Sequence, residues 1–218
     1  MAKISPVTGR YVTFEVDGLE YDYMRWCHMF QPGQGKQNAH LLTEFTRRTR
    51  KLLDETARRR GVDRLALGVR VPQSLKECEY LGFDLATWIK EGLVDYVVPM
   101  VYLTFGLDSN MPIDWIVEAA HNNDASVYPM LQPFYIDEER NRYNLEAAGP
   151  AMMRAAAANN WARGADGHYT WFMKWPLGDA ERNTLSELGD RDLVSEGDKH
   201  FFLRRKTENE QDIDAHLP

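Results

Sequence analysis

Two segments of this chain alternate regularly enough to be predicted as strands with one apolar and one polar face. Within residues 16–26, Leu19, Tyr21 and Tyr23 fall on one side of an extended chain, and Glu20 and Asp22 fall on the other. Residues 65–72 repeat the arrangement, with Arg70 near the end of the polar face. Each strand therefore carries charge toward its carboxyl end, where barrels of parallel strands place their functional groups.

Helical and extended patterns then alternate along the rest of the chain. We predict strands near residues 13–23, 65–71, 94–102, 126–134 and 167–175. Helices are expected over residues 38–60, 74–82, 85–91, 112–122, 145–163 and 183–188. Because about five strand–helix units follow one another, the pattern predicts an α/β fold with a parallel sheet and crossover helices.

The spacing of these units favours an incomplete (β/α)8 barrel of the TIM type. Such a barrel needs eight units and about 250 residues, whereas the 218 residues of this chain supply about five units. Two interpretations remain open. Either three strands are missing upstream of this chain, or its strands form an open α/β sheet.

Composition narrows the function classes. A net charge of −7 argues against a nucleic-acid binder, which needs a basic surface to neutralise phosphates. Because no segment approaches the ~20 apolar residues of a membrane span and no signal-peptide core is found, we expect a soluble protein without a membrane partner. It would be cytoplasmic as given, and a longer parent protein could be secreted or periplasmic. Cys27 and Cys78 have the spacing of neither a disulfide framework nor a metal site.

The first strand and several later segments resemble one group of proteins. Residues 17–25 (DGLEYDYMR) resemble the fourth strand of the family-10-like glycosyl hydrolase proteins, a large bacterial group of (β/α)8 barrels. Segments 30–33, 68–72 and 81–95 fit the same group, and the resemblance extends over residues 14–205.

Since the resemblance starts at strand four, it implies an internal fragment that comprises strands four to eight. Residues 1–205 would form a partial glycoside-hydrolase-like barrel, and residues 206–218 would form a polar tail. Such a fragment exposes strand edges, through which two copies could pair as a homodimer.

A wider resemblance is to the family 18 chitinase-like barrels. Their fourth strand carries the pattern Asp-Gly-x-Asp-x-Asp-x-Glu, and the final Glu of that pattern falls here on Met24. Tyr102 matches their strand-six motif Met-x-Tyr, and Trp171 matches a sugar-stacking tryptophan of strand eight. Because Met24 cannot serve as a general acid, chitinase activity itself is not expected.

Asp22 is the first catalytic candidate and Glu20 is the second. A carboxylate near the end of the inner face can act as acid, base or nucleophile at a glycosidic bond. The alternative for Asp22 is an ion pair with Arg25 or Arg70 at the mouth of the barrel. Glu20 lies one layer deeper, where a carboxylate must be paired or protonated, so a structural salt bridge, to Arg70 for example, is favoured.

Other side chains near the predicted strand ends are candidates for substrate binding. Arginine binds planar anions through two parallel hydrogen bonds, so the arginines could orient an anionic sugar or form a network with the carboxylates. The acidic segment 137–139 is either solvated surface or the source of a second carboxylate. The binding candidates are Arg25, His28, Arg70, Tyr102, Gln132 and Trp171.

These observations predict a glycoside-hydrolase-like protein that acts on a poly- or oligosaccharide by carboxylate acid–base chemistry, without a cofactor or a metal. The first alternative is a non-catalytic carbohydrate-binding or structural barrel fragment, which Met24 supports. The second is a metal-dependent barrel hydrolase or lyase. It is disfavoured because few histidines lie near the predicted strand ends.

Overall fold

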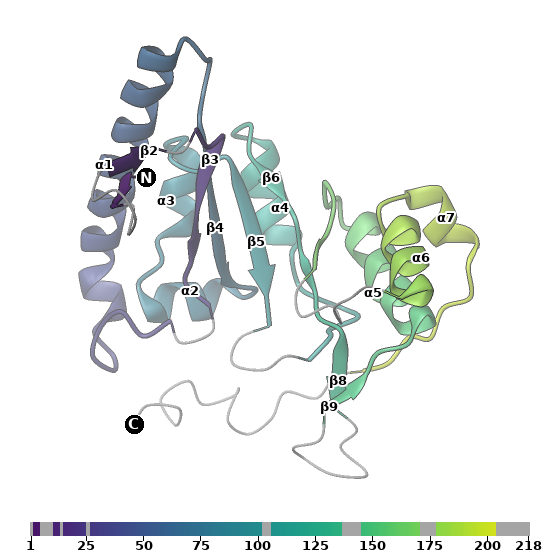
Figure 1. The fold of residues 1–218 in the computed structure, drawn as a ribbon. Helices are drawn as coiled ribbons and strands as arrows, with labels where there is room; N and C mark the ends of the chain where they lie inside the picture. The colour runs from purple at the N-terminus through teal and green to yellow at the C-terminus, as the bar shows by residue number, and fades with distance from the viewer. Residues whose placement is uncertain are drawn as a thin grey trace.

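The protein has a mixed α/β fold, seen in a computed structural model that describes residues 2–4, 11–13, 15–24, 27–101, 106–136, 145–170 and 178–203 (Figure 1). The strands are β1 (Ala2–Ile4), β2 (Tyr11–Thr13), β3 (Gly18–Asp22), β4 (Ala66–Pro72), β5 (Tyr96–Met100), β6 (Ser126–Val127), β7 (Met130–Leu131), β8 (Phe134–Ile136), β9 (Leu145–Ala147) and β10 (Tyr169–Thr170). The helices are α1 (Gly35–Arg60), α2 (Leu75–Leu81), α3 (Leu85–Lys90), α4 (Asp114–His121), α5 (Pro150–Ala162), α6 (Asp179–Leu188) and α7 (Arg191–Glu196).

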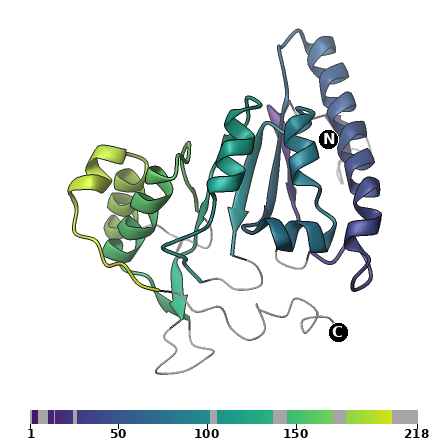
Figure 2. The ribbon, with the colours of Figure 1, turned by 180° about the vertical axis from the view of Figure 1, so that it is seen from behind.

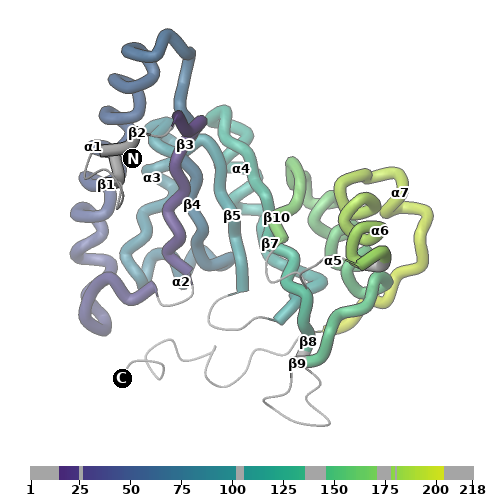
Figure 3. The backbone as a smooth tube through the Cα atoms, viewed as in Figure 1, coloured from purple at the N-terminus to yellow at the C-terminus, as the bar shows by residue number. Residues whose placement is uncertain are grey.

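The main sheet has four parallel strands in the order β3-β4-β5-β6. β7 follows β6 directly along the chain and pairs in parallel with β10. Backbone hydrogen bonds join the two parts, because the Tyr128 N–H donates to the Val97 carbonyl and the Tyr169 N–H donates to the Pro129 carbonyl. Five parallel segments therefore lie side by side in the order in which they occur along the chain (Figure 3).

Helices α1 to α4 cover one face of this sheet (Figures 1 and 2). The fully buried side chains of Leu67, Val69 and Val71 on β4 point to that face. Trp88 of α3 is also fully buried, and its Nε1 donates to Thr43 Oγ1 of α1 at 2.9 Å. Strands in chain order with their helices on one face are typical of a barrel wall, whereas a doubly wound sheet carries helices on both faces.

The face turned away from these helices is concave. The Tyr169 hydroxyl of β10 donates to Glu20 Oε1 of β3 at 3.1 Å, although β10 and β3 are the fifth and the first of the parallel segments. In a flat sheet with strands about 4.8 Å apart, these two would be about 19 Å apart, which is farther than the two side chains reach. The sheet must therefore curve from β3 to β10.

A network of charged side chains joins α1 to the amino ends of β4 and β5. Arg50 of α1 is buried and donates to Asp95 Oδ2 at 2.9 Å and to the Leu65 carbonyl at 2.7 Å. Asp95, which directly precedes β5, also accepts hydrogen bonds from Arg64 and from the Leu67 N–H. The network lies at the edge of the sheet opposite the strand ends that carry charge, so it contributes to stability.

Prolines explain two differences between the predicted and the observed elements. The strand predicted over residues 126–134 is divided into β6, β7 and the start of β8, because Pro129 and Pro133 lack the N–H that a ladder requires. The helix predicted over residues 145–163 starts only at Pro150, a residue suited to the first helical turn, and β9 precedes it as the antiparallel partner of β8.

Other predicted boundaries are close to the observed ones, with small differences at the chain's beginning and end. α1 begins at Gly35, three residues before the predicted start at Asn38. β1 and β2 pair as antiparallel strands in a part of the chain where no strand was expected before residue 13, and α7 was not predicted. The strand predicted over residues 167–175 is seen as β10 in its first part, and residues 171–175 lie outside the described residues. The predicted polar tail, residues 206–218, lies outside the described residues.

Candidate functional site

Glu20 is held on the concave face by two tyrosine hydroxyls. Tyr96 of β5 donates to its Oε2 at 3.0 Å, and Tyr169 of β10 donates to its Oε1 at 3.1 Å. The ring of Tyr128 lies edge-on to that of Tyr96, with 5.8 Å between the centroids. Because both carboxylate oxygens accept a tyrosine hydroxyl, Glu20 is placed as an anchor that ties the first parallel segment to the third and the fifth.

The two tyrosines remain hydroxyl donors over a wide pH range. Burial raises the pKa of Tyr96 well above its ordinary value, and the negative charge of Glu20 adds to the rise. Burial and Glu20 also raise the pKa of Tyr169, while Arg70 acts in the opposite direction. Neither tyrosine is therefore a candidate for a nucleophile or a general base at neutral pH.

Gly68 makes room for the contact between Tyr96 and Glu20. In the register of the sheet, Gly68 of β4 lies between these two residues. A Cβ atom at this position would be 2.0 Å from Cζ of Tyr96 and 2.5 Å from its hydroxyl oxygen. The ring of Tyr96 thus passes directly over Gly68, and any side chain there would displace it.

We expect Gly68→Ala to separate Tyr96 from Glu20 and to lower the free energy of unfolding by about 1 kcal/mol, the contribution of one hydrogen bond. Tyr96→Phe is the matched control, because it removes the hydroxyl and keeps the ring. Since either change breaks the same contact, the double variant should lose less stability in urea unfolding than the sum of the two single losses. Additive losses would contradict this account of Gly68.

Asp22 and Arg70 form an ion pair at the carboxyl edge of the sheet, as one of the two interpretations of the sequence predicted. They are paired in the register of β3 and β4, with Arg70 Nη2 2.8 Å from Asp22 Oδ1. The Met24 N–H donates to the same oxygen at 3.0 Å. The side chain of Arg70 is 4% exposed and that of Asp22 is 50% exposed. A buried guanidinium therefore fixes the orientation of a carboxylate that faces solvent.

Met24 belongs to the core. Its side chain is buried, and the Cys27 thiol donates to its Sδ at 3.9 Å. A buried thioether has no proton to transfer, so Met24 itself cannot act as a general acid.

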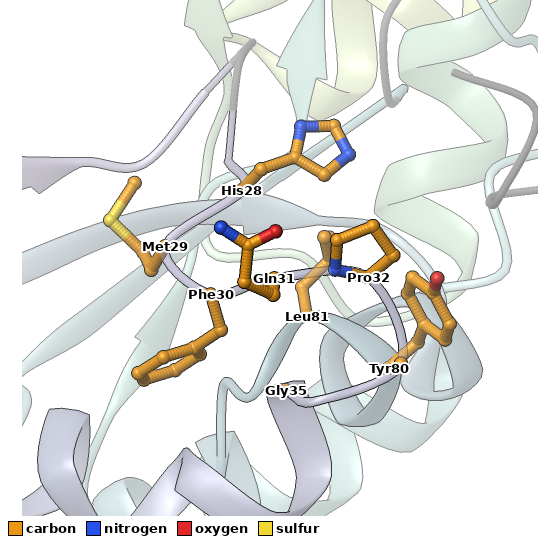
Figure 4. A pocket seen from close by; sticks show the side chains of 9 residues that line it. His28, Met29, Phe30, Gln31, Pro32, Gly35, Tyr80 and Leu81 are labelled. Atoms are coloured by element: carbon orange, nitrogen blue, oxygen red, sulfur yellow. The ribbon is translucent and has the colours of Figure 1, made fainter. Parts of the chain in front are cut away.

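His28 is one of the residues that line a small cavity (Figure 4). The cavity has a volume of about 10 Å³ and lies between the loop of residues 28–33 and the end of α2, where Tyr80 and Leu81 line it. This space holds one water molecule at most, so it is no site for a sugar.

Two buried glutamines follow the strands at the carboxyl edge. Gln132, predicted as a binding residue, comes directly after β7 and is 1% exposed. Gln73, which the sequence reasoning missed, comes directly after β4 and donates to Asp108 Oδ2 at 3.4 Å. Gln73 could have been chosen from the sequence, because it directly follows the predicted strand 65–72, at the end where Arg70 already marked the polar face.

Three predicted binding residues, Arg25, Tyr102 and Trp171, lie outside the described residues, as does the acidic segment 137–139. Of the remaining candidates, Glu20, Asp22 and Arg70 share the concave face. Tyr96 and Tyr169 join them there, and sequence reasoning missed both.

Comparisons with known proteins add no assignment. No protein-family model matches the chain, and no curated protein sequence matches it. In the described ranges, no three His, Cys, Asp or Glu side chains are grouped so that they could hold a metal ion. No described helix is both long and apolar enough to cross a membrane.

Proposed function

We propose that this chain is a glycoside-hydrolase-like protein that acts on an oligo- or polysaccharide at the carboxyl edge of its parallel sheet. The observation that supports it most is the half-exposed carboxylate of Asp22, which is fixed by buried Arg70 at the end of a strand. The choice of a sugar as substrate rests on the resemblance of residues 17–25. The chain-ordered strands with their helices on one face agree with the barrel fold of that group.

In this proposal Asp22 is the charged group at the glycosidic bond. Arg70 and the Met24 N–H both contact its Oδ1, so we assign Oδ2 to the proton transfer or to the stabilisation of positive charge on the sugar ring. Arg70 is then a positioning residue, because its buried guanidinium holds the carboxylate in one orientation.

Glycoside hydrolysis ordinarily requires a second carboxylate. Glu20 is ill suited to this role, because both of its oxygens already accept tyrosine hydroxyls. Asp108, in the segment after β5, lies near the same edge of the sheet, where Gln73 donates to it. We assign Asp108 as the second carboxylate, so Asp108→Asn should lower turnover with little change in stability.

The test is Asp22→Asn, which keeps the size of the side chain and removes its charge. Assayed on a panel of aryl glycosides and polysaccharides, it should lower kcat at least about a hundredfold, the contribution of one general acid or base. Glu118→Gln, on the exposed side of α4, is the matched control and should leave kcat unchanged. Equal turnover by wild type and Asp22→Asn would contradict the role of Asp22.

A non-catalytic carbohydrate-binding protein is the second candidate, and the buried Met24 favours it. It predicts no turnover by the wild type but measurable heat of binding in calorimetry with an oligosaccharide. Under this alternative Asp22→Asn weakens binding only. A wild-type protein that neither binds nor cleaves any sugar of the panel would contradict both candidates.

A further inference from the structure

The long helix α1 exposes a regular stripe of side chains on the side opposite its buried face. Leu41, Phe45 and Leu52 are each more than half exposed, and Arg48 and Glu55 alternate with them. The successive spacings of four and three residues keep these positions on one side of the helix, as in the a and d positions of a coiled coil. We call this set the α1 stripe; it consists of Leu41, Phe45, Arg48, Leu52, Glu55 and Arg59.

The α1 stripe is accessible and rigid. α1 forms one flank of the molecule, beyond β3, in both ribbon views (Figures 1 and 2). The ring of Phe45 stacks on Tyr21 of β3 with 5.3 Å between the centroids, yet 52% of Phe45 remains exposed. Its exposed part is therefore held in place before any partner arrives, which lowers the entropic cost of binding.

We propose that the α1 stripe is the interface between two copies of this chain, with the two helices antiparallel about a two-fold axis at Leu52. Around this axis Leu52 contacts Leu52 of the other copy, and Arg48 faces Glu55 on both sides. Phe45 faces Arg59, which can place its guanidinium over the ring.

At the ends of the contact, Leu41 faces Val62. Val62 follows the carboxyl end of α1 and is 41% exposed. Every position of the stripe thus meets a side chain of complementary character.

The charged residues of the stripe favour a two-fold axis at Leu52 over an axis at other positions along α1. Moving the axis to between Arg48 and Thr49 would bring Arg48 against Arg48 of the other copy. Moving it to Arg50 would bring Arg48 against Leu52 and Phe45 against Glu55. Charged residues within an apolar stripe cost stability but specify register and orientation, as polar residues in coiled coils do.

The complementarity of the stripe with itself identifies the occupant as a second copy. Against its own reversed copy, the stripe pairs Leu52 with Leu52, Arg48 with Glu55 and Phe45 with Arg59. These are an apolar contact, an ion pair and a contact between a cation and an aromatic ring, and a surface that binds a different partner would not need to be complementary to itself. A single helix pair lies at the low end of specific interface areas, so we expect a dimer with a Kd in the micromolar range.

Sedimentation of the full chain over a range of concentrations tests the dimer. Arg48→Glu and Glu55→Arg each place like charges opposite one another, so each should raise Kd at least about tenfold. The double variant Arg48→Glu/Glu55→Arg should restore the wild-type Kd. Both substituted positions lie on the surface of α1, and circular dichroism checks that the fold is kept. A monomer up to millimolar concentration, or a Kd that the double variant fails to restore, would overturn the proposal.

Cross-linking tests the register independently of the mass. Leu52→Cys places two thiols next to the axis, so a short bis-maleimide should link the copies. In Phe45→Cys the two thiols lie on opposite sides of the axis, about 21 Å apart along it, beyond the reach of the same reagent. Cys27 and Cys78 are fully buried and give little background. Equal cross-linking of the two variants would exclude this register and overturn the proposed interface.

Discussion

Arg50→Met should lower the free energy of unfolding by about 3–5 kcal/mol, the effect of breaking a buried ion pair from one side. The side chain of Arg50 is 5% exposed. It donates to Asp54, to Asp95 and to the Leu65 carbonyl, all within 2.7–2.9 Å. Met fills the space of the aliphatic part but offers no donor. The Leu65 carbonyl therefore loses the guanidinium, and Asp95 Oδ2 keeps the Leu67 N–H as a donor but loses its ion pair with Arg50.

The measurement is urea unfolding followed by circular dichroism, with Glu44→Gln as the control. Glu44 pairs with Arg48 on the surface of the same helix, and both side chains are at least half exposed. That pair should contribute less than about 0.5 kcal/mol. If Arg50→Met were as mild as Glu44→Gln, the network at the amino edge would not hold α1 to the sheet.

Acidification should destabilise the protein through His168, by about 3 kcal/mol between pH 6.5 and pH 4. The Nδ1 atom of His168 lies 3.1 Å from the Leu188 carbonyl, and its ring stands perpendicular to Trp161 at 4.9 Å. Burial lowers its pKa from 6.5 to about 4, although hydrogen bonds to backbone carbonyls oppose the shift. The unfolded chain therefore takes up a proton below pH 6.5 that the folded protein takes up only near pH 4. The stabilising contribution is complete above pH 6.5 and is lost as the pH falls to 4.

His168→Gln isolates this contribution, because the amide can still donate to the Leu188 carbonyl and does not titrate. From pH 7 to pH 4, the wild type should lose about 3 kcal/mol more unfolding free energy than the variant. Because both proteins carry the same carboxylates, the effect of carboxylate titration cancels when the two unfolding free energies are subtracted. A difference independent of pH would show that His168 is as accessible to protons in the folded protein as in the unfolded one.

The alternating pattern of residues 18–22 and 66–72 was sufficient to predict both strands and the faces of their side chains. The ion pair of Asp22 and Arg70 could be anticipated, because both residues end the polar faces of neighbouring strands. Tyr96 could not be assigned to Glu20, since residues 94–102 form a continuous apolar run and its contact depends on the register of three strands. Nor does the sequence indicate that the ring of Tyr96 passes over Gly68, because that contact too depends on the register of β4 and β5.

The contact of Tyr169 with Glu20 could not be predicted from the sequence for a different reason. Its contact with Glu20 depends on the curvature of the whole sheet, and curvature is a sum of small twists that no local pattern encodes. The strand β9 was missed because Leu145–Ala147 has the composition of a helix, and its pairing with β8 overrides that preference.

The contact between Tyr169 and Glu20 also bears on how the chain folds. Each parallel strand pairs with the one made just before it, so most of the sheet can assemble in the order of synthesis, one crossover at a time. The hydrogen bond between Tyr169 and Glu20 joins residues 149 positions apart and can form only when the last segment is in place. Contacts of such long range are associated with slow folding. Until that bond forms, a growing chain can hold Glu20 with the Tyr96 hydroxyl alone, and the first and fifth parallel segments are not yet joined.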